Sequence, residues 1–316
     1  MPQPRNARRR VIVGSIVRVA RRLVIAGSIG IVIAVALVAI FVAEGAVHGW
    51  APRQPDPADA ERVARAASAS WQSARVTAAD GAPLSAWLFT PQSPNGSAVI
   101  VLHGVNDTRH GVLYHAQYLL QAGFTVLAPD SRGHGASGGD LLTYGIREAS
   151  DIHAWADALF RTDRIGRLYG LGESMGAAVL IESLPREPRF RAVVAECPFA
   201  TFDDMAYYRL EWVSGLGRWA SWPVAQTGFL YVRLRYGVDL EQASPAAAIR
   251  ATQVPILLIH GTRDVNVPPR ESRMLHALNP QATSLWLVPG AVHVSAIGAC
   301  PEEYVRRVVG WFRSHP

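Results

Sequence analysis

The sequence contains no lysine, only two cysteines, and no acidic residue among its first 22 positions. All its basic side chains other than histidine are therefore arginines, a bias typical of bacterial genomes of high G+C content that indicates nothing about activity. Cys197 and Cys300 show no Cys-x-x-Cys spacing and no cluster with histidine, which argues against a structural zinc site. They can form a disulfide outside the cytoplasm or remain two small apolar residues, and the sequence leaves both alternatives open.

The excess positive charge is concentrated at the N-terminus. Residues 1–22 carry seven arginines, whereas the rest of the chain has 24 arginines and 25 acidic residues. The formal net charge of +6 therefore gives the remainder no basic excess with which to bind phosphates. Because the arginine block also lacks interleaved aromatic side chains, we expect no nucleic-acid partner and place these arginines near anionic lipid headgroups.

Residues 23–43 form an uncharged apolar run of 21 residues. A helix of this length measures about 31 Å, enough to cross the hydrocarbon core of a bilayer. A cleaved signal peptide is the alternative, but its apolar region is shorter and no Ala-x-Ala site follows this one. The positive-inside rule keeps the arginine block in the cytoplasm. The sequence thus predicts a single-pass anchor in the bacterial inner membrane, with residues 44–316 on the far side.

The chain divides into four predicted parts. An Arg-rich cytoplasmic segment (1–22) and a transmembrane helix (23–43) precede a Pro/Ala-rich stalk (44–72), which contains Pro52, Pro55 and Pro57. A globular domain is predicted to span 73–316, and its sequence contains no visible internal repeat.

Within this domain, short apolar runs alternate with helical patterns. This alternation predicts right-handed βαβ units, hence an α/β fold with a mostly parallel twisted sheet and helices on both faces. Around Asp80-Gly81 the sequence predicts an antiparallel hairpin at the start of the sheet. The predicted parallel strands are 98–102, 124–128, 168–171, 192–195, 256–259 and 285–288.

Residues 203–250 interrupt the alternation, because they are rich in aromatic side chains and contain no clear strand. An insertion at this place would lie over the strand ends as a helical lid. Its aromatic residues, such as Tyr207 and Trp212, would then either contact substrate or form the core of the extra helices, and both can hold.

The pentapeptide Gly172-Glu173-Ser174-Met175-Gly176 lies between an apolar strand and a helical run. A Gly-x-Ser-x-Gly sequence in this context predicts a nucleophile elbow, in which a strained turn presents the serine hydroxyl at the top of a sheet. A side chain at either flanking glycine would collide with the neighbouring strand or helix. The alternative is a plain turn, which the strand before and the helix after it disfavour.

Acyl transfer also requires a base and an acid that orients the base. Asp264 follows the strand at 256–259, and His293 follows the last strand after a glycine turn, so the order Ser, acid, His is complete. Asp203 and Asp204 are the alternative acids. Without a catalytic role, Asp264 would be a turn aspartate and His293 a solvated loop histidine.

Two backbone N–H groups are needed for the developing oxyanion. We expect one from Met175, at the start of the helix after the nucleophile, where amides are unpaired. The other is expected from Val105 in His103-Gly104-Val105, where Gly104 allows a tight bend and His103 orients the loop.

Taken together, these motifs resemble the α/β-hydrolase superfamily over roughly residues 75–316. The stretch from Asp130 to Ser137, which contains Arg-Gly-His-Gly, is similar to a branch of esterase-, thioesterase- and serine-aminopeptidase-like hydrolases, many of them membrane-anchored. The segment Thr143-Tyr144-Gly145-x-x-Glu148-x-x-Asp151 carries the same resemblance. The resemblance implies that Arg132 and His134 maintain the structure of this loop and have no catalytic role.

The predicted function is that of a serine hydrolase, which cleaves carboxylic esters or thioesters with an apolar acyl or aryl part. Its expected partner is a small-molecule or lipid-like acyl substrate. No metal or organic cofactor is required by such chemistry. A serine peptidase or amidase of the same fold is the alternative, since the triad does not distinguish amides from esters. An anchored binding protein that has lost catalysis belongs to another class, and the complete triad argues against it.

Overall fold

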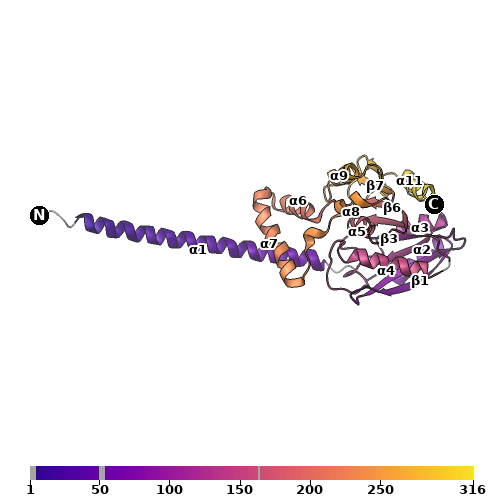
Figure 1. The fold of residues 1–316 in the computed structure, drawn as a ribbon, viewed down its shortest axis with the longest axis horizontal. Helices are drawn as coiled ribbons and strands as arrows, with labels where there is room; N and C mark the ends of the chain where they lie inside the picture. Colours follow the sequence, from indigo (N-terminus) through magenta and orange to yellow (C-terminus); the bar gives the residue numbers. More distant parts are fainter. Residues whose placement is uncertain (1–4, 50–53, 163) are drawn as a thin grey trace.

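The computed structural model describes residues 5–49, 54–162 and 164–316, which form a long N-terminal helix and an α/β domain (Figure 1). Helix α1 spans Arg5–His48. The apolar run at 23–43 is therefore the middle of a longer helix. Its part Ser15–His48 is long and apolar enough to cross a membrane. Of the most apolar stretch of 18 residues in this part, only 6% is buried inside the protein.

One mixed sheet of eight strands, in the order β1-β2-β4-β3-β5-β6-β7-β8, forms the centre of the domain. The pairs β1/β2 and β2/β4 are antiparallel, and every other pair is parallel. The central strands are apolar without alternation because helices cover both of their faces. The predicted hairpin and parallel sheet are confirmed. The strands are β1 (Ala69–Thr77), β2 (Pro83–Pro91), β3 (Ser97–Leu102), β4 (Thr125–Pro129), β5 (Arg167–Glu173), β6 (Phe190–Glu196), β7 (Ile256–Gly261) and β8 (Thr283–Val288).

Helices cover the sheet in two layers, each closing one apolar core. The first layer comprises α2 (Pro57–Ala66), α3 (Leu113–Gln121), α10 (Ala296–Ala299) and α11 (Pro301–Ser314). The second comprises α4 (Glu148–Phe160), α5 (Met175–Ser183), α8 (Pro245–Ala251) and α9 (Arg270–Leu278). Cys197, directly after β6, and Cys300, directly before α11, are free thiols, so these residues act as small apolar side chains.

The prediction of a stalk over 44–72 is wrong at both ends. Helix α1 continues to His48, and α2 buries Ala60, Val63 and Ala64 against the domain. Asp56 caps α2 by accepting a hydrogen bond from the N–H of Ala58, at 3.0 Å. A short helix is compatible with the alanine-rich composition, but its packing on the domain was not predicted, so the domain begins before residue 73. Pro52 lies outside the described residues.

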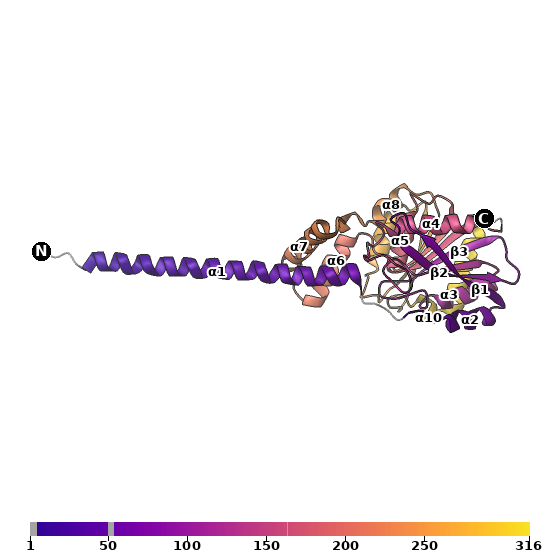
Figure 2. The same ribbon diagram turned by 90° about the horizontal axis from the view of Figure 1, so that it is seen from below.

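A third apolar cluster lies above the carboxyl ends of the strands, where the lid was predicted. Its helices are α6 (Phe202–Ser214) and α7 (Arg218–Tyr236), followed by the short turn η1 (Leu240–Gln242). Figures 1 and 2 show α6 and α7 beside the last part of α1, between the domain and the free length of that helix. Ala43 and Val47 of α1 pack into the same cluster as Phe202 and Phe229.

Candidate active site

Ser174 lies at the sharp turn between β5 and α5. Its backbone has φ +51° and ψ −115°, in the left-handed half of φ that a residue with a side chain rarely adopts. A Cβ at Gly172 would lie 2.5 Å from the carbonyl oxygen of Gly176, and a Cβ at Gly176 would lie 2.6 Å from that of His103. The two glycines are therefore required by the close approach of strand and helix. The N–H of Ser174 donates to Glu196 O at 2.8 Å, which fixes the turn to β6.

The structure brings Ser174, His293 and Asp264 together at the carboxyl end of the sheet. The Oγ of Ser174 lies 2.9 Å from Nε2 of His293, and Nδ1 of His293 lies 2.6 Å from Oδ2 of Asp264. The other oxygen of Asp264 accepts hydrogen bonds from the N–H groups of Asn266 and Val267, at 2.9 and 3.0 Å. The rival acids Asp203 and Asp204 lie instead in the first turn of α6.

Asp264 is buried, and burial alone would raise its pKa. The hydrogen bonds from His260 and His293 outweigh burial and hold the pKa of Asp264 well below its usual range. His260 is fully buried, with Nε2 2.8 Å from Val267 O and 3.3 Å from Oδ2 of Asp264. Its Nδ1 lies 2.7 Å from Ser272 Oγ. No role was predicted for His260 from the sequence, because its contact with Asp264 is known only from the structure.

The two residues expected to supply amides to the oxyanion line the same cavity as Ser174. Met175 is the first residue of α5, whose N-terminus favours negative charge. Gly104 approaches from the end of β3, so closely that a Cβ there would lie 3.4 Å from the Cβ of Ser174. Val105 follows it and lines the same cavity as Ser174 and Met175.

His103 holds the loop that carries Val105. Its Nδ1 lies 2.7 Å from Gly104 O and must carry the proton, while Nε2 accepts from the N–H of Ser131 at 3.0 Å. Burial, together with the nearby His134, lowers the pKa of His103 to about 4, so the ring stays neutral. The structure thus gives His103 the orienting role that the sequence predicts.

The Arg-Gly-His-Gly loop supports the site from behind. Arg132 forms ion pairs with Asp151 and Asp80, at 2.7 and 2.8 Å. His134 receives the N–H of Asn106 on Nε2, at 3.3 Å, and thereby braces the oxyanion loop. Arg132 and His134 are both buried, and neither contacts Ser174 in any hydrogen bond that the described residues form.

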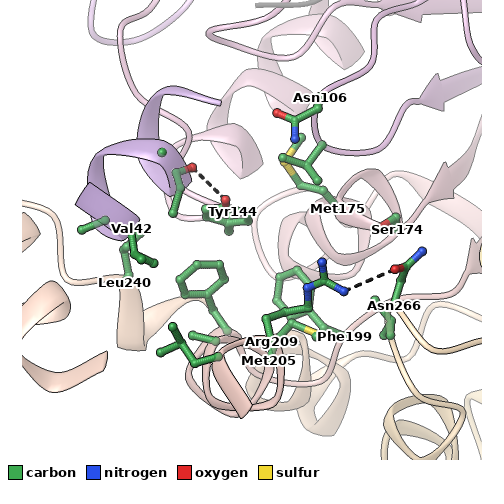
Figure 3. Close-up of a pocket in the computed structure, with 18 of the residues that line it drawn as sticks. Val42, Asn106, Tyr144, Ser174, Met175, Phe199, Met205, Arg209, Leu240 and Asn266 are labelled. Carbon is green, nitrogen blue, oxygen red and sulfur yellow. Dashed lines mark hydrogen bonds between the residues drawn. The ribbon is translucent and has the colours of Figure 1, made fainter. Parts of the chain in front are cut away.

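A cavity of about 700 Å³ opens above Ser174 and His293 (Figure 3). Its walls are mainly apolar. Among the described residues, Tyr207 and Trp212 do not line it, because Tyr207 is buried in the lid core and Trp212 is exposed. The lining comes from α6 and α7 (Met205, Leu210, Ala225, Phe229, Val232), from the loops (Val105, Tyr144, Phe199, Asn266, Val294) and from α1 (Ala39, Val42, Ala43, Gly45, Ala46).

Among the residues that the structure describes, two groups of side chains have the types that ligate metals. In the first group, Cys197 lies near Asp264 and His293. Both ring nitrogens of His293 are already hydrogen-bonded, one to Asp264 and the other to Ser174. The second group is His115, Glu173 and Glu196.

All members of this second group are already engaged. His115 lies between Tyr118 OH, at 2.9 Å, and Glu173, at 2.7 Å. Glu196 accepts from Tyr304 OH at 2.7 Å. Burial and the neighbouring charge of Glu173 raise the pKa of Glu196. These hydrogen bonds explain the second group as polar packing behind the nucleophile turn.

Comparison with known proteins agrees with this geometry. Residues 110–315 match the sequence model of the prolyl oligopeptidase family. The chain belongs to the prolyl oligopeptidase family. Within known sequences, the uncharacterized protein YqkD of Bacillus subtilis (strain 168) is 31% identical over 204 residues. That match covers 64% of this chain and 65% of YqkD, just under two thirds of its length.

Solved structures extend the likeness to the whole domain. Esterase Pf2001 of Pyrococcus furiosus superposes with a TM-score of 0.66 at 26% identity, over 84% of this chain and 99% of the esterase. The acylaminoacyl peptidase of Pyrococcus horikoshii shares the fold, with a TM-score of 0.58 at 19% identity over 78% of this chain and 42% of the peptidase. This member of the prolyl oligopeptidase family is therefore a serine hydrolase of the α/β-hydrolase fold.

Proposed function

We propose that the protein hydrolyses carboxylic esters or thioesters whose acyl or aryl part is apolar. The observation that carries this proposal is the position of Ser174, hydrogen-bonded to His293, at the floor of a mainly apolar cavity of about 700 Å³. A cavity of this size and lining suits an apolar group. The likeness to an esterase over its entire length supports the same conclusion.

In the proposed mechanism, Ser174 Oγ attacks the acyl carbonyl carbon while Nε2 of His293 takes its proton. The amides of Met175 and Val105 donate to the oxyanion. Collapse of the tetrahedral intermediate expels the alcohol or thiol, which receives the proton from His293. Water then attacks the acyl-enzyme with the same base, releases the acid and restores Ser174. Asp264 holds the His293 ring and stabilises its positive charge.

A fluorophosphonate probe and a series of p-nitrophenyl esters test the proposal. We expect the full-length protein to be labelled, and Ser174→Ala to lose labelling and to lower kcat by about 10⁶, as in a comparable triad enzyme. Ser150→Ala on α4 is the control and should keep both. Unchanged ester hydrolysis by Ser174→Ala would refute the assignment, and absence of labelling in the parent would favour a catalytically silent binding protein.

Peptidase or amidase activity is the second candidate, and the family membership itself favours it. Because the same triad can cleave amides, only the measured substrate preference distinguishes the two activities. Peptidyl p-nitroanilides assayed beside the esters separate the two. A higher kcat/KM for the anilides would replace the esterase proposal.

We further propose that α1 anchors the enzyme in the bacterial inner membrane, with the N-terminus in the cytoplasm and the hydrolase domain outside it. The seven arginines before residue 23 and the apolar helix Ser15–His48 support this orientation. Alkaline phosphatase fused after residue 316 should be active in cells. An intact N-terminus in the purified protein would separate an anchor from a cleaved signal sequence.

A further inference from the structure

Helix α1 is packed tightly on the lid. Its residues Ala39, Ala43 and Val47 are buried, and their spacing of four places them on one face of the helix. This face meets Gly228 of α7, where an added Cβ would lie 3.5 Å from the carbonyl oxygen of Ala39 and 3.6 Å from the Cβ of Ala43. Small residues on both helices therefore let the two backbones approach closely, as in membrane helix pairs.

Hydrogen bonds fix the same part of α1. The hydroxyls of Tyr231 and Tyr236, both from α7, donate to one carboxylate oxygen of Glu44, the latter at 2.7 Å. On the other side, Tyr144 OH donates to Ala46 O at 2.8 Å, a bond drawn in Figure 3. The end of α1 is therefore an integral part of the lid.

This end of α1 also lines the cavity above Ser174. Ala39, Val42, Ala43 and Ala46 contribute to the wall, and all four are small or medium-sized apolar residues. The cavity consequently runs from the nucleophile to the helix that is to cross the membrane. A substrate whose acyl group reaches the far wall would contact α1 directly.

The length of the membrane span determines where this part of the cavity wall lies relative to the bilayer. If the span begins after Arg22, about 20 residues at 1.5 Å each cross a core of about 30 Å. The far boundary of the hydrocarbon core then falls near Val42, and Glu44 with its two tyrosines falls at the headgroup level, where aromatic side chains are enriched. The α6–α7 unit packed on α1 must lie at the same level.

The surface of the α6–α7 unit fits that position. Trp219 is 82% exposed. Other large apolar side chains are also exposed on this unit, a distribution that costs free energy in water and none in a bilayer interface. They are Trp212, Val213, Leu216, Trp222 and Leu234.

We propose that the cavity is an acyl-binding site whose outer wall is the membrane helix, and that it takes the acyl chain of a bilayer lipid ester directly from the far leaflet. This proposal rests on the proposed ester hydrolysis and names its substrate class. The acyl chain never has to cross water, because the lid and α1 join the cavity to the membrane. Val42 then becomes a residue that determines chain-length specificity.

The test uses the full-length protein in palmitoyl-oleoyl phosphatidylglycerol vesicles. The substrates are p-nitrophenyl butyrate, which is soluble, and p-nitrophenyl palmitate and monopalmitoylglycerol, both dissolved in the vesicles. Val42→Trp places a large ring in the cavity wall. Val32→Trp is the matched control, because Val32 is exposed on the same helix and away from the cavity.

We expect Val42→Trp to lower the palmitate-to-butyrate ratio of kcat/KM by about tenfold or more, as a lost methylene-sized space can, and Val32→Trp to leave that ratio unchanged. The double variant Trp219→Ser/Trp222→Ser should slow hydrolysis of monopalmitoylglycerol in vesicles. An equal ratio in Val42→Trp and Val32→Trp would overturn the proposal, as would cleavage of an S-palmitoylated peptide without cleavage of monopalmitoylglycerol.

Fluorophosphonate labelling separates this test from the proposed function. If the unsubstituted protein neither labels nor hydrolyses p-nitrophenyl butyrate, the ester hydrolase proposal itself fails. If Val42→Trp still labels, and so is folded, but keeps the parent chain-length profile, only the acyl-wall proposal is overturned.

Discussion

Asp264→Asn tests the triad most sharply, because the structure determines how an amide would sit there. One oxygen of Asp264 accepts two backbone N–H groups, from Asn266 and Val267. An NH₂ group at that place would face two donors, so the amide oxygen must occupy it. The NH₂ group is then directed at Nδ1 of His293, 2.6 Å away, and at Nε2 of His260, 3.3 Å away.

The consequence is a wrong tautomer. His293 can then only accept at Nδ1, so it carries its proton on Nε2, which faces Ser174 and can no longer take the serine proton. In a comparable triad the same change lowers kcat about 10⁴-fold, or about 5.5 kcal/mol in activation free energy. His260 loses its charged acceptor as well, which costs about 1.5–3 kcal/mol of stability and lowers Tm by roughly 5 °C.

The assay is kcat/KM for p-nitrophenyl butyrate, measured with Tm on the same preparation. Asp203→Asn on α6 is the matched control, since Asp203 is a rival acid by sequence, and we expect it to stay within about twofold, the scale of surface substitutions. Activity of Asp264→Asn within tenfold of the parent would refute the tautomer argument. Equal losses in both variants would show that the acid was misassigned.

Two further predictions concern the frame of the site. Burial and the neighbouring Glu148 raise the pKa of Glu182 to about 9, so the folded state keeps a proton that the unfolded chain loses above the ordinary glutamate pKa of 4.5. Stability should therefore fall as the pH rises from 4.5 toward 9, and Glu182→Gln should raise Tm by several degrees at pH ~8 and less at pH ~5. Exposed Glu241→Gln is the control, and an equal Tm change at both pH values would contradict the argument. Gly176→Ala places a Cβ 2.6 Å from His103 O, so it should abolish probe labelling or prevent folding; full labelling would contradict the close approach.

The sequence predicted the fold and the site because local signals and chain order agreed. Buried parallel strands are apolar throughout, and the carboxyl ends of such strands lie at one edge of the sheet. Ser174, Asp264 and His293 each follow a strand, so their convergence is a consequence of topology. His260 escaped notice because its role depends on a side-chain contact with Asp264 that follows from no periodicity.

The packing of residues 57–66 and the lining of the cavity could not be predicted for a different reason. Composition showed that residues 57–66 are rich in alanine, but only the packed structure shows that Ala60 and Val63 face the domain. Likewise, Tyr207 and Trp212 were the natural candidates to line the cavity because aromatic residues dominate the lid. The cavity is lined instead by other residues of the lid, such as Met205 and Phe229, because Tyr207 is buried in the lid core and Trp212 is exposed.

The face of helix α1 that contacts the lid could not be predicted from the sequence. A membrane span is apolar on all sides, so its hydrophobic pattern cannot distinguish a face that contacts lipid from a face that contacts protein. The difference lies in small residues: Ala39 and Ala43 meet Gly228, and the chain that continues to Glu44 is held by two tyrosines of α7. A hydrolase domain expressed without this helix would lack one wall of its cavity and would expose the lid face that the wall covers. On the proposals made above, the anchor and the specificity site are the same element, and substrate preferences are to be measured on the full-length protein in a bilayer.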